Sequence, residues 1–61
     1  MNDAQRACLL DEARLLRTGA EKLRERAREQ ANFLKPHIRM SILESAVESD
    51  ELAAKLEEGL L

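Results

Sequence analysis

Two side chains in the middle of the sequence have types and a spacing that could support nucleophilic chemistry. His37 and Ser41 lie four residues apart, so on a helix they would share a face where the imidazole could take the proton of the hydroxyl. A working nucleophile also needs an oxyanion hole and a substrate cavity, which a thin helical chain does not provide. We therefore predict that the chain is not an enzyme and has no catalytic residues.

Acidic pairs are the next candidates, because paired carboxylates can hold a cation. Asp50 with Glu51 and Glu57 with Glu58 are adjacent in sequence, so on a helix their side chains diverge instead of converging on an ion. The single cysteine and single histidine leave too few ligands for a structural zinc site. We expect no metal site and no cofactor.

Basic side chains are concentrated in the first part of the chain. Residues 1–39 hold nine Lys/Arg and six Asp/Glu, whereas residues 40–61 hold one and six, so a net charge of −2 conceals halves of +3 and −5. Five of these cations share one side at helical spacing, and we call them the arginine ridge: Arg14, Arg17, Arg24, Arg28 and Lys35. Beside the exposed leucine and valine of the second helix, this ridge suits either an acidic, partly apolar protein partner or the acidic second helix of a sister subunit.

The elements that must position these residues are helices, because Ala, Leu, Glu and Arg dominate the sequence. Asn2 followed by Gln5 has the spacing of a capping box, which predicts a helix over 3–33. Pro36 lacks an N–H and disfavours helix before it, which predicts a turn over 34–36. A second helix over 37–59 follows.

Two questions about these helices stay open. Ser49, followed by two acids, could cap a fresh helix, so a break there is an alternative. The proline could also kink one long helix instead of reversing the chain.

Two matching apolar stripes favour the reversal. Each stripe advances by alternating steps of four and three residues, with leucine or isoleucine alternating with small residues. The stripes are Leu9, Ala13, Leu16, Ala20, Leu23 and Ala27 in the first helix and Ile42, Ala46, Ser49, Ala53, Leu56 and Leu60 in the second. In an antiparallel pair whose residue numbers sum to 69, every member of one stripe meets a member of the other. We predict one all-α domain over 1–61, an antiparallel two-helix hairpin with an alanine/leucine seam.

The hairpin register makes two further predictions about the flanks of the seam. It places Arg17 near Asp50, and it places Gly19 where Leu52 needs room.

The alternation of alanine and leucine in the seam resembles that of the Rop family of plasmid copy-number repressors. Those proteins are two-helix hairpins that dimerise into four-helix bundles and bind paired RNA loops. The resemblance covers the architecture and the small/large seam, and no RNA-contacting residue of that family carries over to this sequence. It implies dimerisation into a four-helix bundle.

Apolar residues outside the seam also predict contact with a second chain, because a hairpin of this size buries little apolar surface by itself. They form a ridge on the second helix and a patch on the overhanging start of the first: Met40, Leu43, Val47, Ala54 and Leu61, and Ala4, Ala7, Cys8 and Leu15. The ridge serves either self-association, with a dimer as the simplest assembly, or docking of a different protein.

These features favour a non-enzymatic interaction module that binds and regulates a larger protein, as an inhibitor, adaptor or co-chaperone. Bacterial and phage regulators include proteins of this size. The alternative is a dimeric nucleic-acid-binding regulator that uses the arginine ridge. No apolar run reaches the roughly 18 residues of a membrane span, so we expect no membrane partner and a cytoplasmic location.

Overall fold

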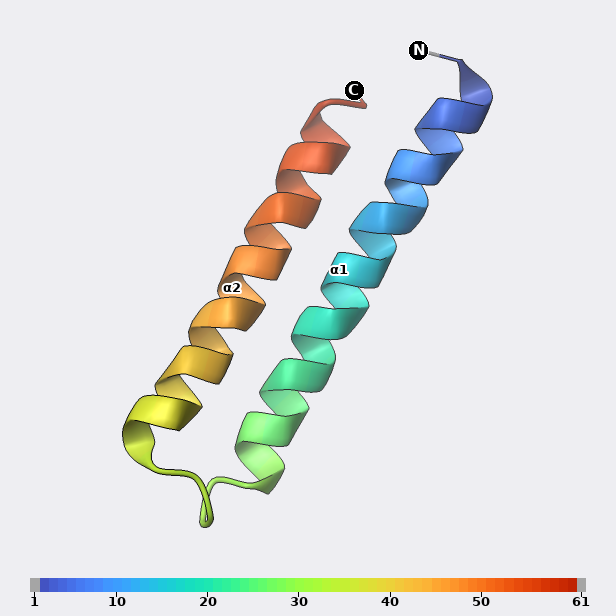
Figure 1. Ribbon diagram of the computed structural model, residues 1–61. Coiled ribbons are helices and arrows are strands. Elements are labelled where there is room, and N and C mark those ends of the chain that lie inside the picture. Colours follow the sequence, from blue (N-terminus) through green and yellow to red (C-terminus); the bar gives the residue numbers. More distant parts are fainter. Residues whose placement is uncertain (1, 61) are drawn as a thin grey trace.

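Two antiparallel helices joined by one turn make up the computed structural model, which describes residues 2–60 (Figure 1). Helix α1 spans Asp3–Glu29, and helix α2 spans Pro36–Glu58. The predicted all-α hairpin is confirmed, and the kinked single helix is excluded. None of the described helices is long and apolar enough to cross a lipid bilayer.

The predicted capping box forms at the start of α1. The backbone N–H of Gln5 donates to Oδ1 of Asn2 at 2.8 Å, and the backbone N–H of Asn2 donates to Oε1 of Gln5 at 3.1 Å. Two backbone donors that would otherwise lack helical partners are thereby satisfied. Asp3 in the first turn adds a favourable interaction with the helix dipole.

The turn is longer than predicted and begins earlier. Helix α1 ends at Glu29, four residues before the predicted end at residue 33, and the turn occupies residues 30–35. Backbone N–H groups of Phe33 and Leu34 both donate to the carbonyl oxygen of Gln30 at 2.9 Å and close the turn. The prediction used the proline as the stop signal, but proline restricts only its immediate neighbourhood, whereas the chain must also cross to the second helix axis.

Helix α2 begins at Pro36 and ends one residue before the predicted 59. Its N-cap, Lys35, is extended and makes no side-chain capping hydrogen bond. The helix runs without interruption through Ser49, so the alternative of a break there is wrong. Ser49 is half-buried within the seam and does not cap a new helix.

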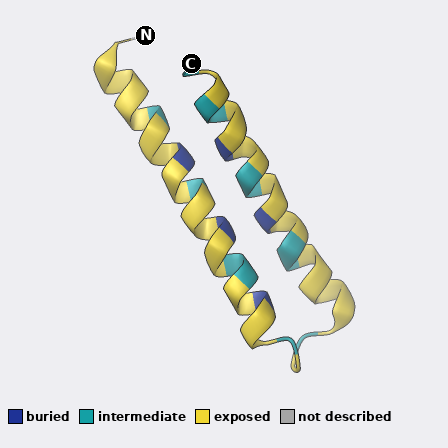
Figure 2. Cartoon of the chain, turned by 180° about the vertical axis from the view of Figure 1, so that it is seen from behind, coloured by how far each residue is buried: buried dark blue, intermediate teal, exposed yellow. Residues whose placement is uncertain are grey.

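The predicted seam is confirmed by burial along the facing sides of the two helices (Figure 2). All five residues that are fully buried within residues 2–60 are alanines of the seam: Ala13, Ala20, Ala27, Ala46 and Ala53. The other seven seam residues are half-buried: Leu9, Leu16, Leu23, Ile42, Ser49, Leu56 and Leu60. The core is therefore thin, because no described large side chain is fully enclosed by the two helices.

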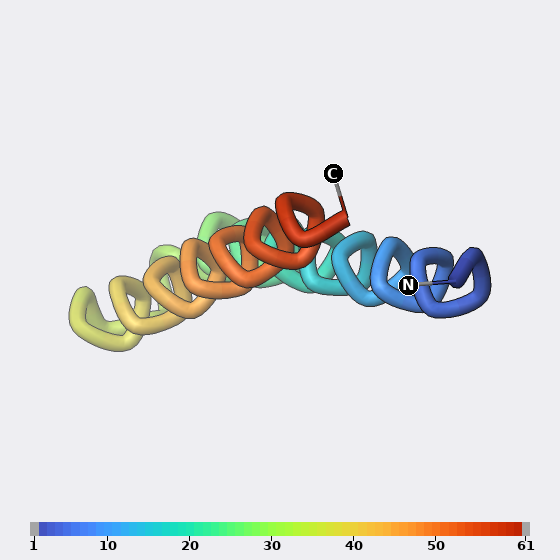
Figure 3. The backbone as a smooth tube through the Cα atoms, turned by 90° about the horizontal axis from the view of Figure 1, so that it is seen from above, coloured from blue at the N-terminus to red at the C-terminus, as the bar shows by residue number. Residues whose placement is uncertain are grey.

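The hairpin is an elongated rod, with Cα extents of 47 × 14 × 11 Å. The first turns of α1 extend past the described end of α2 (Figures 1 and 3). This overhang carries Ala4, Ala7 and Cys8, all of which are exposed.

Gly19 does not have the role that the seam register predicted. A Cβ atom added at Gly19 would meet no atom within 4 Å, and Leu52 is 53% exposed. Leu52 therefore does not pack over Gly19, and the packing of this hairpin leaves the space beside the glycine open.

Candidate protein-binding face

Two ion pairs join the helices along one side of the hairpin, which we call the arginine face. Nε of Arg17 donates to Oε1 of Glu57 at 2.7 Å, and the guanidinium of Arg24 donates to the carboxylate of Asp50. The residue numbers of both pairs sum to 74 (17 + 57 and 24 + 50), so the pairs repeat the same antiparallel relation two turns apart.

The predicted neighbour of Arg17 was Asp50, and the observed hydrogen-bond partner is Glu57. Helical side chains lean toward the N-terminus of their own helix. In an antiparallel pair, Arg17 and Glu57 lean toward each other. Asp50 lies closer to the turn, and Arg17 leans away from it. Asp50 instead meets Arg24, although its charge still contributes weakly to raising the pKa of Arg17.

The hydrogen bond between Arg17 and Glu57 perturbs both groups. It holds the pKa of the Glu57 carboxyl below its ordinary value of 4.5 and raises the pKa of the Arg17 guanidinium. Both side chains remain over 40% exposed, so water screens the attraction and the pair stabilises the fold only modestly.

The structure divides the predicted arginine ridge. Arg17 and Arg24 are already paired with acids of α2. Arg14 and Arg28 are exposed and make no ion pair within residues 2–60. Lys35 lies in the turn, beyond the end of α1, so it does not continue the ridge along the helix as predicted.

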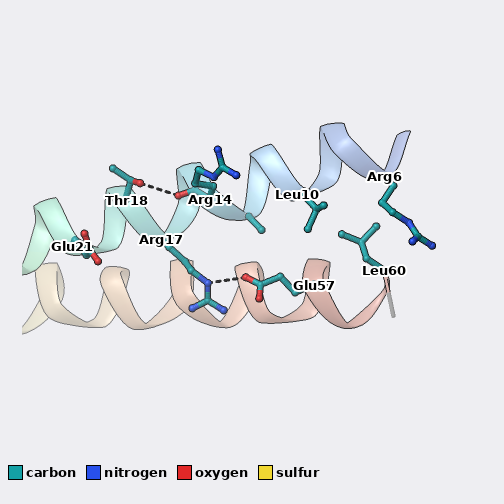
Figure 4. Close-up of a pocket in the computed structure, with 9 residues that line it drawn as sticks. Arg6, Leu10, Arg14, Arg17, Thr18, Glu21, Glu57 and Leu60 are labelled. Atoms are coloured by element: carbon teal, nitrogen blue, oxygen red, sulfur yellow. Dashed lines mark hydrogen bonds and ion pairs between the residues drawn. The ribbon is translucent and has the colours of Figure 1, made fainter. Parts of the chain in front are cut away.

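A groove of about 610 Å³ lies on the arginine face near the chain termini (Figure 4). Leu10 of α1 and Leu60 after α2 approach each other across it, beside Arg6. Arg14 and the ion-paired Arg17 continue the lining. Sequence reasoning missed Arg6 and Leu10, although Arg6, Leu10 and Arg14 follow one another at steps of four residues, which could have placed them on one side.

The predicted apolar ridge of α2 lies at the turn end of the same face. Met40 and Val47 are 57% and 49% exposed, and Leu43 is half-buried. Met40 and Leu43 line a hollow of about 340 Å³ together with Leu34 of the turn. With Val47 they also line a second hollow of about 420 Å³.

The second hollow has an acidic edge, formed by Glu44, Glu48 and Glu51. Ala54, which the sequence assigned to the same ridge, is exposed on α2, and the predicted Leu61 lies outside the described residues.

The remaining predicted interface residues do not all share this face. Successive residues of a helix are rotated by about 100°, so positions two apart point in nearly opposite directions. Leu15 precedes Arg17 by two residues, and Cys8 precedes Leu10 by two, so both point away from the arginine face. The same relation to Arg6 turns Ala4 away, whereas Ala7, seven residues before Arg14, returns to the arginine side.

Ser41, one member of the candidate catalytic pair, makes a local hydrogen bond to the backbone of the other. The hydroxyl of Ser41 donates to the backbone carbonyl of His37 at 3.0 Å, a bond within the first turns of α2. Among residues 2–60, no three His, Cys, Asp or Glu side chains gather where they could hold a metal ion. The arrangement that the hairpin offers is a surface with exposed apolar side chains, unpaired arginines and an acidic edge.

Comparisons with known proteins assign no family to this surface. No family model matches the chain, and no curated protein or solved structure is significantly similar to it.

Proposed function

We propose that this chain is a small non-enzymatic protein-interaction module. It self-associates into a four-helix bundle and uses its arginine face to bind and regulate a larger protein. The observation that carries the proposal is the exposure of Met40 and Val47, with half-buried Leu43, on a hairpin whose fully buried core, among the residues described, consists of alanines. Exposed apolar side chains that lie together mark an interaction surface.

Self-association is supported by the size of the core. A chain of about 60 residues buries too little apolar surface to be more than marginally stable unless another element contributes. The single cysteine excludes an internal disulfide as that element. A second chain would supply the missing burial, as the resemblance to dimeric hairpins also implies.

The chemistry of the arginine face defines its partner. Met40, Leu43 and Val47 offer an apolar strip, and Arg14 and Arg28 offer guanidinium groups for carboxylates. Interface cores favour methionine and arginine over lysine and glutamate. The partner that fits this face is a protein surface that combines aliphatic side chains with acidic ones.

Site-specific photo-crosslinking in the native host tests the partner assignment. A photoreactive residue at Val47 should join the chain to one larger protein, and Arg14→Glu with Arg28→Glu should reduce the yield. The matched control is the same photoreactive residue at Glu25, on the outer side of α1. Equal product from both positions, or no larger product from Val47, would contradict the assignment.

A nucleic-acid-binding regulator is the second candidate, and the unpaired state of Arg14 and Arg28 favours it. With Lys35, three cations of the predicted arginine ridge remain to neutralise phosphates, because Arg17 and Arg24 are engaged by acids. Three phosphate contacts predict a slope of about −2.7 for the logarithm of affinity against the logarithm of salt concentration on duplex DNA. A titration showing no affinity for duplex or hairpin nucleic acid at low salt would exclude this candidate.

A further inference from the structure

We propose that self-association uses the side of the hairpin opposite the arginine face, and that two copies of α1 cross antiparallel at Gly19. The occupant of this side is thus a second copy of the chain. We call it the glycine face and define it by Glu12, Leu15, Gly19, Arg26 and Leu52. The proposal rests on the self-association proposed above and assigns its surface and register.

Gly19 is the first observation. It lies near the middle of the 27-residue α1, where glycine destabilises a helix relative to alanine. Its backbone does not have positive φ, and an added Cβ would meet nothing within 4 Å. Neither local conformation nor packing inside the hairpin therefore requires glycine. A role that remains is to admit the close approach of another backbone, which a missing Cβ allows.

Exposed leucines on the same side are the second observation. Leu15 and Gly19 lie two positions before and after Arg17, and Leu52 lies two positions after Asp50. Arg17 and Asp50 belong to the two different ion pairs of the arginine face, so these three residues point to the other side of the hairpin. Leu15 is 67% exposed and Leu52 is 53% exposed, so each helix presents a large apolar side chain on the side of the hairpin that carries Gly19.

Charge complementarity identifies the occupant as a second copy. When two α1 helices cross antiparallel at Gly19, facing residues have numbers that sum to 38. Glu12 then faces the partner's Arg26, and twofold symmetry repeats this pair at the other end of the contact. Neither Glu12 nor Arg26 makes an ion pair in the part of the chain that the structure describes.

The apolar side chains follow the same register. Leu15 faces the partner's Leu23, which is half-buried in the hairpin and still offers surface. The arginine face cannot pair α1 with α1 in this way, because Arg14 would face the partner's Arg24. A stable dimer needs roughly 800 Å² from each partner, about a sixth of the 4944 Å² surface of the hairpin. A helical rod 47 Å long can offer that area along one side.

Charge reversal of the full-length chain, followed by sedimentation equilibrium, tests the register. Glu12→Arg alone and Arg26→Glu alone should each raise the dimer dissociation constant at least roughly tenfold, because symmetry turns two attractions into two repulsions. The double variant E12R/R26E should return within about threefold of the wild-type constant, because it restores both pairs with exchanged signs. Circular dichroism verifies that each variant remains helical. The register would be overturned if the double variant lost as much dimer affinity as the two single variants lose together.

A bulky side chain at Gly19 tests whether the glycine face is the dimer interface. Its result can be distinguished from a failure of the chain to self-associate at all. Gly19→Leu should abolish the dimer and leave a helical hairpin, because the space beside residue 19 is open within one chain. Glu25→Leu, a matched addition on the outer side, should leave the dimer intact. A dimer that tolerates Gly19→Leu but dissociates with Val47→Glu would overturn the glycine face and retain self-association. A wild-type chain that stays monomeric at millimolar concentration would overturn both.

Discussion

Arg17 and Arg24 show at the scale of single residues how the fold changes the meaning of a basic sequence. Both belong to a run that reads as cationic, yet both are engaged by acids of α2. Of the helical part of the predicted ridge, Arg14 and Arg28 remain for an external ligand, because their charges are unpaired among the described residues. A count of arginines therefore overstates the positive surface that this side of α1 presents.

Acid titration should reveal the contribution of the Arg17–Glu57 pair. Because the pKa of Glu57 is lower in the folded chain than its ordinary 4.5, the pair stabilises the fold above that pH. The stabilisation is lost as pH falls through the folded value. The matching rise in the pKa of Arg17 acts only at strongly alkaline pH.

Denaturation of wild type and Glu57→Gln measures this effect. The wild-type chain should be more stable at pH 7, and the difference in free energy of unfolding should vanish once the pH falls below the lowered pKa of Glu57 in the folded chain. The control is Glu58→Gln, which removes a neighbouring acid that makes no ion pair in the described structure. A difference that persists unchanged in acid would refute this role for Glu57.

The helices are held together at the scale of elements by close approach and not by large interlocking side chains. The alanines at the centre of the seam are fully buried, while the leucines at its edges retain exposed surface. Such a seam tolerates little added volume, because a larger side chain would push the helix axes apart.

Introducing leucine at a buried site and at an exposed site of α1 tests this seam. Ala20 is completely inaccessible, so Ala20→Leu should lower the free energy of unfolding by about 1–3 kcal/mol through overpacking. Glu25→Leu on the exposed side of α1 should change it by less than about 0.5 kcal/mol. Urea denaturation measures both. Equal effects would show that Ala20 is not at the helix contact.

At the scale of the whole molecule, the hairpin has two sides that differ in chemistry. The arginine face combines charge with an apolar strip, which suits a different protein. The glycine face carries both an acid, Glu12, and a cation, Arg26, and the pairing that we propose between them suits a second copy. A chain with both could dimerise and still present two arginine faces, one on each side of the assembly.

Stability should therefore depend on protein concentration. A ligand that binds only the folded state stabilises it by mass action, and for a dimer that ligand is the second chain. We expect the thermal midpoint to rise by several degrees, as an order of magnitude, across a hundredfold increase in concentration. Thermal melts followed by circular dichroism measure it. A midpoint independent of concentration, in a chain that remains folded when dilute, would argue for a stable monomer.

The sequence by itself determined the helices, their antiparallel pairing and the seam. Period, capping and small/large alternation are local signals, and every seam residue that they selected is buried or half-buried. The candidate binding face was predictable in part, since Met40, Leu43 and Val47 line one hollow, as their helical spacing requires.

Only the tertiary structure decided which arginines are paired, where the turn begins and what surrounds Gly19. Ion-pair partners depend on how side chains lean across two helices, and neither that lean nor the crossing of the turn is encoded in residue spacing. The sequence also left open that Leu15 and the α2 ridge lie on different sides, because it shows which residues are left over but not which side of the paired helices they occupy. The two sides of the hairpin are defined by the contact between its helices, and that contact is known only from the tertiary structure.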